Sequence, residues 1–147
     1  MRLISQKAVL LALLFVACRS TTEPERLMGL FTLENINGRA LPTYLSPTPG
    51  LTPTIVSATL NFQPDGTVFV TELRRNPDGS QAAVTTTVNY TKHGNEIEMG
   101  NFWICALSTG CDPLHGTIIG QTLSLVVIVN PDDSAVVYNY RMTPIAL

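Results

Sequence analysis

Few side chains in this sequence could carry out chemistry, and they are scattered. The 147 residues include only two histidines, His93 and His115, and the sequence fixes no nucleophile or carboxylate beside either of them. Glu96 and Glu98 alternate in a predicted strand and so share a face, but a glycosidase pair needs a cleft between its carboxylates. The sequence contains neither a nucleophile elbow nor a phosphate-binding loop. We therefore expect a protein that is not an enzyme.

Cysteines are the other reactive side chains. An oxidising compartment would pair Cys105 with Cys111 as a disulfide. A metal site that adds Asp112 and His115 is the alternative. However, the five residues between the cysteines exceed the roughly two to four of a usual zinc knuckle, and no fourth ligand is evident. We expect the disulfide, with no metal and no other cofactor.

The third cysteine, Cys18, follows a segment with the layout of an export signal. Arg2 and Lys7 come first, and residues 8–17 (AVLLALLFVA) form an unbroken apolar run. A helix that spans a membrane needs roughly 20 apolar residues, whereas the core of a signal peptide needs about 7–15. Residues 1–17 are therefore predicted to be a signal peptide.

The junction Phe15-Val16-Ala17-Cys18 resembles the lipobox of bacterial lipoproteins. In that family the signal is cut before the cysteine, which then carries lipid, so the resemblance implies lipidation of Cys18 and firm attachment to a membrane. Secretion with cleavage nearby and an unmodified Cys18 is the alternative, which would give a secreted or periplasmic protein. In the family, Asp after the cysteine retains the protein in the inner membrane. Arg19 therefore favours the outer membrane of the cell envelope.

Charge and composition describe the rest of the sequence. Residues 18–147 hold seven Lys/Arg and eleven Asp/Glu, a formal net charge of −4, and no basic stripe, so nucleic acid is not an expected partner. Residues 19–28 (RSTTEPERLM) are polar, which predicts that residues 18–28 are a lipidated tether. Residues 29–147 form a single domain that is long enough to bury a core.

Residues from Gly29 onward show the alternation and the turn signals of an all-β protein. Four prolines between Leu41 and Pro53 predict a long loop or flap. An apolar run over Phe102–Ala106 follows one of the predicted strands. The eight main strands are expected at residues 29–36, 56–62, 67–75, 81–92, 96–99, 115–119, 122–129 and 135–142.

Three of these strands show an apolar face that should point into a core, because side chains alternate between the two faces of a strand. The predicted inward residues are Val56, Ala58, Leu60 and Phe62 in the second strand, Ala82, Val84, Thr86, Val88 and Tyr90 in the fourth, and Val136, Tyr138, Tyr140 and Met142 in the last.

Tight turns such as Asn37-Gly38 make neighbouring strands antiparallel. An open sheet of eight strands would expose an edge at each side, and closure into a barrel removes both edges. We therefore expect an eight-stranded antiparallel up-and-down barrel. A β-sandwich uses the same strand patterns and is the alternative.

Several phrases between residues 29 and 142 resemble those of bacterial lipocalin-like lipoproteins, and a META-like domain has a similar pattern. The resemblance implies a lipocalin-like barrel behind the signal peptide. The phrases are Gly29-Leu30-Phe31, Ile36-Asn37-Gly38, Leu41-Pro42, Phe62-x-x-Asp65-Gly66-Thr67, Tyr90-x-x-x-Gly94-x-x-Ile97 and Gly116 to Leu123.

A barrel of eight strands has room for its own side chains or for one small ligand. A ligand pocket would use aromatic side chains with a few polar groups, although a packed core would use the same aromatics. The candidate ligand-binding residues are Trp103, Tyr90, Tyr138 and Phe62. We expect a lipid-anchored, non-enzymatic protein that binds a small apolar molecule. The alternative is a solid barrel that binds another envelope protein through loops such as Pro42–Pro53 or Ala106–Gly110.

Overall fold

The computed structural model describes residues 26–44, 54–100, 112–128 and 135–143, and every regular element within these ranges is a β-strand. The strands are β1 (Gly29–Ile36), β2 (Arg39–Ala40), β3 (Thr43–Tyr44), β4 (Thr54–Phe62), β5 (Thr67–Arg75), β6 (Gln81–His93), β7 (Glu96–Met99), β8 (Leu114–Ile119), β9 (Thr122–Ile128) and β10 (Ala135–Thr143).

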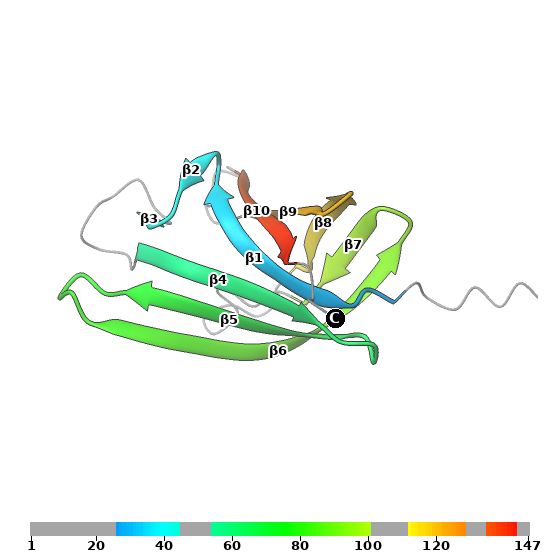
Figure 1. Ribbon diagram of the computed structural model, residues 1–147, viewed down its shortest axis with the longest axis horizontal. Helices are drawn as coiled ribbons and strands as arrows, with labels where there is room; N and C mark the ends of the chain where they lie inside the picture. Colours follow the sequence, from blue (N-terminus) through cyan, green and yellow to red (C-terminus); the bar gives the residue numbers. More distant parts are fainter. Residues whose placement is uncertain (1–25, 45–53, 101–111, 129–134, 144–147) are drawn as a thin grey trace, which may run out of the picture.

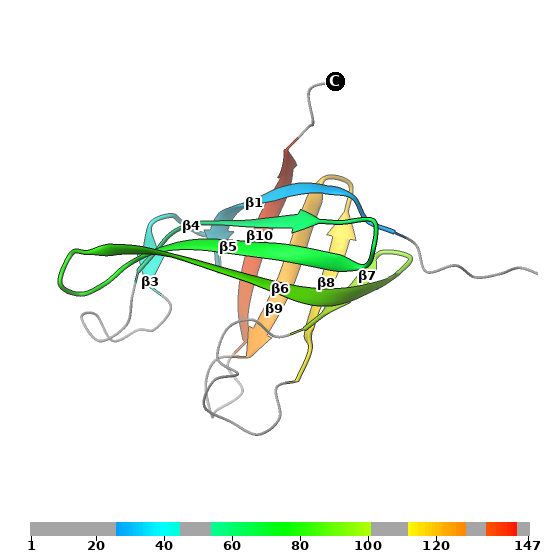
Figure 2. The ribbon, with the colours of Figure 1, turned by 90° about the horizontal axis from the view of Figure 1, so that it is seen from below.

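The strands form one antiparallel sheet that closes on itself (Figure 1). From β4 to β10 each strand pairs with the next, β10 pairs with β1, and β1 pairs with β4 to complete the circle. The short strands β2 and β3 are added beside β1 and β4. The predicted eight-stranded up-and-down barrel is confirmed, and the β-sandwich is excluded. Strands β4 to β6 cross strands β8 to β10 at a steep angle on opposite sides of the barrel (Figure 2).

The core fills the inside of this barrel, where buried side chains alternate with exposed ones along the strands. The predicted inner face of β10 is confirmed, since Val136, Tyr138 and Tyr140 are buried and Met142 packs against the core. The other buried apolar residues are Phe31, Leu33, Ile36, Ile55, Ala58, Leu60, Phe62, Val68, Val70, Tyr90, Ile97, Met99, Leu114, Ile118, Leu123, Leu125 and Val127.

The prediction for β4 was wrong at its beginning. The strand starts at Thr54, and Ile55 is the fully buried residue where Val56 was expected. The pairing with β5 shifts register between Ile55 and Ser57, which inserts one extra residue. Such an irregularity changes which residues face the core, so the simple alternation holds only from Ala58 onward.

The prediction for β6 was wrong over its first half. Of the five residues expected to point into the core, only Tyr90 is buried. Thr86 and Val88 are half-buried, and Val84 is 40% exposed. Within the described ranges, residues 81–88 of β6 pair with β5 and with no other strand. The alternation of the sequence is present there, but no strand of the described part of the chain packs over that stretch of the face.

The segment predicted as a loop from Leu41 to Pro53 begins with the short strand β3, which pairs with Thr54 and Ile55 of β4. Thr43 and Tyr44 lie between prolines, and both are residue types that favour strands. The remainder of that segment, residues 45–53, lies outside the described residues, as does the apolar run Phe102–Ala106.

The two ends of the barrel are built differently. At the turn end, tight turns at residues 63–66, 94–95 and 120–121 join the strands, and every neighbouring pair around the barrel is matched. At the loop end, β1, β5, β7 and β9 finish and β4, β6, β8 and β10 begin. There β4 separates from β1 after the pair Thr32–Thr59, and the tip of the β5–β6 hairpin projects beyond the barrel (Figure 1).

Candidate functional site

A carboxylate is buried inside the barrel, in the half nearer the loop end. Glu72 of β5 continues the inward series of Val68 and Val70, and its side chain is only 2% exposed. It lies between Ala58 of β4 and Val84 of β6 in the sheet, so all three side chains share the inner face. A charged group in such a place is costly unless it is paired, so its surroundings decide what it can do.

Arg74 is the partner of Glu72 and lies two residues further along the same face of β5. Its Nε and Nη2 groups donate hydrogen bonds to Oε2 of Glu72, at 3.0 and 2.6 Å. The Arg74 side chain is 22% exposed, so the pair extends from the interior toward the loop end. Both bonds end on the same oxygen. The other oxygen, Oε1 of Glu72, is buried and has no hydrogen-bond partner among the described residues.

Two tyrosines of β10 complete this group, which we call the inner polar cluster: Glu72, Arg74, Tyr138 and Tyr140. Both tyrosines are fully buried, and no hydrogen bond to the Tyr140 hydroxyl is found within the described ranges. Burial raises the pKa of both hydroxyls, and the negative charge of Glu72 raises each pKa further. The tyrosines are therefore uncharged hydrogen-bond donors, and the charge of Glu72 acts on both of them.

Burial also raises the pKa of Glu72 above its ordinary value, although the hydrogen bonds and the charge of Arg74 act in the opposite direction. Desolvation is the largest cause, because the interior favours the uncharged form of an acid. The cluster thus presents a carboxylate oxygen and a tyrosine hydroxyl that lack partners in the described part of the chain. These two groups can hold the polar end of a molecule that enters the barrel.

The turn end of the barrel is filled by an aromatic group made of Phe31, Phe62 and Tyr90. The ring of Phe62 meets Phe31 edge-on, with centroids 5.4 Å apart, and meets Tyr90 edge-on at 5.0 Å. These are favourable geometries for aromatic pairs in a core. The three rings fill the interior at this end, and the inner polar cluster lies in the other half of the barrel.

The hydroxyl of Tyr90 joins the segment before β1 to the barrel. It accepts a hydrogen bond from the backbone N–H of Leu27 at 2.9 Å. Its own hydrogen is donated to the carbonyl of Leu27 at 2.7 Å, and the carbonyl of Gln63, at 3.1 Å, is a second acceptor for it. Leu27 also packs against the core. Tyr90 therefore holds the end of the predicted tether in place, and its polar atom is already satisfied.

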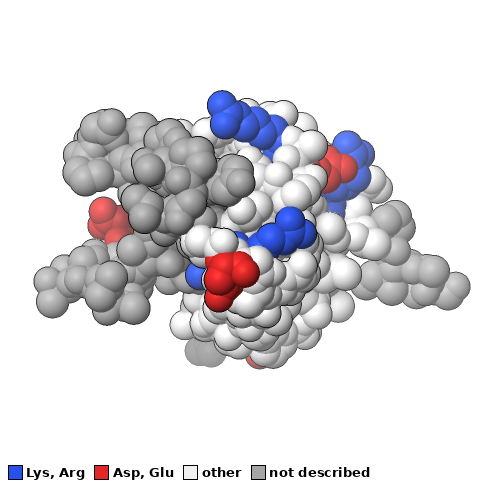
Figure 3. Space-filling model, turned by 90° about the vertical axis from the view of Figure 1, so that its left-hand side faces the viewer, with Lys and Arg blue, Asp and Glu red and all other residues white. Residues whose placement is uncertain are grey.

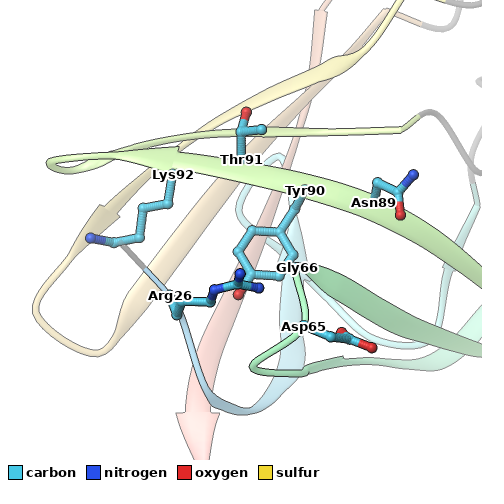
Figure 4. Close-up of a pocket in the computed structure, with 7 residues that line it drawn as sticks. All are labelled: Arg26, Asp65, Gly66, Asn89, Tyr90, Thr91 and Lys92. Carbon is cyan, nitrogen blue, oxygen red and sulfur yellow. The ribbon is translucent and has the colours of Figure 1, made fainter. Parts of the chain in front are cut away.

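A surface hollow of about 250 Å³ lies beside this junction (Figure 4). Arg26 lies next to Tyr90 and Gly66, and Lys92 also lines the hollow. Asp65 lines it as well, but its Oδ1 accepts two hydrogen bonds from Thr67, which lower the pKa of Asp65. No residue of the inner polar cluster lines this hollow.

The predicted site residues are distributed over both halves of the molecule. Phe62 and Tyr90 lie together in the aromatic group, whereas Tyr138 belongs to the inner polar cluster. Four predicted residues lie outside the described ranges: Trp103, Cys18, Cys105 and Cys111. The lipidation, the disulfide and the role of Trp103 therefore stay predictions.

Sequence reasoning missed Glu72 and Arg74. The signal was present, because Val68, Val70, Glu72 and Arg74 occupy alternate positions of a strand that was predicted with its observed bounds. A charged residue in the inward series of a barrel strand could have been singled out as a polar group inside the core.

The remaining ionisable candidates lie on the outside. Glu98 and His115 face each other across β7 and β8, with Nδ1 and Oε2 3.8 Å apart, and more than half of each side chain is exposed. No group of three or more His, Cys, Asp and Glu residues that could hold a metal occurs among the described residues. On the face in Figure 3, the described surface carries separate charges of both signs and no continuous positive patch.

No protein-family model, curated protein or solved structure matches this chain. Within the described ranges, no helix has the length and the apolar character to cross a membrane. The barrel is therefore identified from its strand pairing alone, and membership of this chain in the lipocalin-like lipoproteins stays a prediction.

Proposed function

We propose that this protein is a lipid-anchored β-barrel of the bacterial cell envelope that binds a small, mainly apolar molecule at the loop end of its barrel. The lipobox-like junction at Cys18 supports the anchor. The lipocalin-like phrases between residues 29 and 142 support the ligand-binding role. The binding is non-enzymatic.

The observation that carries this proposal is an inner face that is partly uncovered. Val84 lies on the inner face of β6, directly beside Glu72, and yet 40% of it is exposed. Near this level β4 has left β1, and residues 81–88 of β6 have only β5 as a described neighbour. An apolar molecule at this place would cover apolar surface that the described chain leaves in contact with water.

Binding can be tested with N-phenylnaphthylamine, an uncharged apolar fluorophore. The protein would be produced as residues 18–147 with Cys18→Ser, which lacks both the apolar segment of the predicted signal peptide and the lipid acceptor. We expect saturable fluorescence enhancement that Val84→Asp abolishes. The matched control is Thr85→Asp, which places the same charge on the outer face of β6 and should leave binding unchanged. Absence of saturable binding, or equal binding by the Val84→Asp variant, would contradict the proposal.

The anchor has a separate test. Cells that express the protein would be labelled with a palmitate analogue, and the wild type compared with Cys18→Ala. We expect label on the wild type alone, together with its recovery in the outer-membrane fraction. A labelled Cys18→Ala variant, or an unlabelled wild type, would remove the anchor from the proposal.

A second function is favoured by the same stretch of β6. Residues 81–88 contain no charged residue and no proline, although exposed strand edges usually carry such residues to prevent pairing. Another envelope protein could add a strand there, whereas the interaction expected from the sequence uses the loops Pro42–Pro53 or Ala106–Gly110. Pull-down from solubilised membranes would test it: a partner captured by the wild type and lost with Thr85→Lys and Thr87→Lys together would favour this function.

A further inference from the structure

We propose that the molecule bound at the loop end carries a neutral polar head, such as a hydroxyl, that donates a hydrogen bond to Oε1 of Glu72 and accepts one from the hydroxyl of Tyr140. This inference rests on the proposed function and names the class of its ligand: an apolar molecule with an uncharged head that both donates and accepts.

The unpaired oxygen of Glu72 is the first argument. Oε1 is buried, while the two hydrogen bonds that Arg74 donates to Glu72 both end on Oε2. A buried carboxylate oxygen without a donor costs free energy that a ligand's donor would recover. The ligand head must therefore offer an N–H or O–H group to Oε1.

Tyr140 supplies the second argument. Its hydroxyl is buried without a partner in the described ranges, and it can donate one hydrogen bond. In the strand ladders, Glu72 is opposite Ala58, Thr59 is opposite Thr32, and Leu33 is opposite Tyr140, so Glu72 and Tyr140 lie at about the same level of the barrel. The charge of Glu72 also raises the pKa of Tyr140. A hydroxyl head has one hydrogen to donate and two lone pairs to accept, so it matches an acceptor and a donor together.

Charge excludes the ionic heads. Glu72 and Arg74 already form a pair of opposite charges in the interior. A carboxylate head would be repelled by Glu72 and would offer no hydrogen to Oε1. An ammonium head could donate, but it would leave an unbalanced positive charge beside Arg74 in a dehydrated place. A neutral head avoids both costs.

The exposure of Val84 supplies the third argument, because 40% of this inner-face side chain is accessible to a ligand. Val84 and Glu72 are directly opposite in the β5–β6 ladder. Side chains in that relation are separated by roughly 5 Å between Cβ atoms. On the other side of Glu72 lies Ala58, which has the smallest side chain among the described residues of the buried core.

The test compares decanol, decylamine and decanoate, which share a ten-carbon chain and differ in their heads. Each would displace N-phenylnaphthylamine from residues 18–147 with Cys18→Ser at neutral pH. We expect decanol to bind at least about tenfold more tightly than either ionic compound. In Glu72→Leu the preference should fall below about threefold, because the acceptor is gone. Tyr140→Phe, which keeps the carboxylate, should weaken decanol severalfold and leave decanoate unchanged.

A matched control is Glu34→Gln, since Glu34 also pairs with an arginine, Arg141, but on the outside of the barrel. It should leave the preference intact. If Glu72→Leu does not fold, as judged by circular dichroism, the displacement measured with Tyr140→Phe is the test of the inference. Equal displacement by the three compounds, or tightest binding of decanoate or decylamine, overturns the inference while the proposed function stands. Failure of the fluorophore to bind at all overturns the proposed function.

Discussion

The turn end and the loop end of this barrel differ in how completely their strands are paired and their buried polar groups are hydrogen-bonded. At the turn end all neighbouring strands pair, the rings of Phe31, Phe62 and Tyr90 fill the interior, and the Tyr90 hydroxyl has partners for its hydrogen and its lone pair. In the half near the loop end, β4 separates from β1, and Oε1 of Glu72 and the Tyr140 hydroxyl lack partners in the described ranges.

This difference separates stability from function. Well-packed apolar side chains and satisfied polar groups contribute to the folding free energy, whereas buried unsatisfied groups oppose it. A chain keeps such groups where another molecule can satisfy them, which is common at binding sites. We therefore expect substitutions at the turn end to destabilise the barrel and substitutions in the inner polar cluster to change binding.

The largest effect is expected from Phe62→Ala. It removes a buried ring that contacts two other rings, and such a change costs about 3–5 kcal/mol of unfolding free energy. Val84→Ala, at the loop end, removes a side chain that is 40% exposed and should cost less than about 1 kcal/mol. Urea unfolding followed by circular dichroism measures both. Comparable losses for the two variants would mean that the ends are equally well packed.

The next effect concerns two tyrosine hydroxyls. Tyr90→Phe removes the hydrogen bonds to Leu27 and leaves its backbone groups without them, which should cost about 1–3 kcal/mol. Tyr140→Phe removes a buried hydroxyl that has no partner in the described ranges, so its cost should be near zero or of opposite sign. Thermal unfolding of the two variants is the measurement. A loss for Tyr140→Phe as large as that for Tyr90→Phe would show that the Tyr140 hydroxyl is satisfied.

A smaller and pH-dependent effect is expected at Glu72. Burial raises the pKa of Glu72 in the folded state above its ordinary value of 4.5. A raised pKa contributes stability that is present below the unfolded pKa and is lost as the pH rises through the folded pKa. Glu72→Gln mimics the uncharged form. Its unfolding free energy relative to the wild type should therefore increase from about pH 4 to neutral pH.

The difference in unfolding free energy between Glu72→Gln and the wild type isolates the contribution of Glu72. The pKa values of Asp65 and Asp78 are lowered by hydrogen bonds from Thr67 and Ser80, so both carboxylates act on stability with the opposite sign, but they are present in both proteins. Urea unfolding across the pH range measures the difference. A difference that falls with rising pH would show that the pairing with Arg74 outweighs the burial.

The barrel could be predicted from sequence because its signals are local. Turn residues such as Asn37-Gly38 and the alternation in β10 fix the strands, and the need to remove free edges predicts closure. The observed φ angles of Asn37 and Gly38, 51° and 75°, are those that such a two-residue turn requires.

What sequence could not show depends on partners that are distant in the chain. The register shift in β4 depends on its pairing with β5, and the exposure of Val84 depends on which strands flank β6. The pairing of Oε2, but not Oε1, with Arg74 depends on side-chain conformation. For this reason only one member of the inner polar cluster was predicted: Tyr138 was named among the candidates, and Glu72, Arg74 and Tyr140 were not.

The smallest expected effect concerns two turns that have the same hydrogen-bond pattern. In Asp65-Gly66-Thr67 and Asp78-Gly79-Ser80, the aspartate Oδ1 accepts hydrogen bonds from the backbone N–H and the hydroxyl two residues later. The first turn adjoins Tyr90, since the N–H of Tyr90 donates to the carbonyl of Gly66. The second lies at the projecting tip of the β5–β6 hairpin.

Asp65→Ala should therefore lower Tm measurably, because its turn belongs to the fully paired end, where local opening requires the aromatic group to open too. Asp78→Ala should leave Tm nearly unchanged, because the hairpin tip can open without disturbing the core. The second change should instead speed amide exchange at Ser80, a local measure. Equal shifts in Tm would show that the projecting hairpin unfolds together with the barrel, so that both ends belong to one cooperative unit.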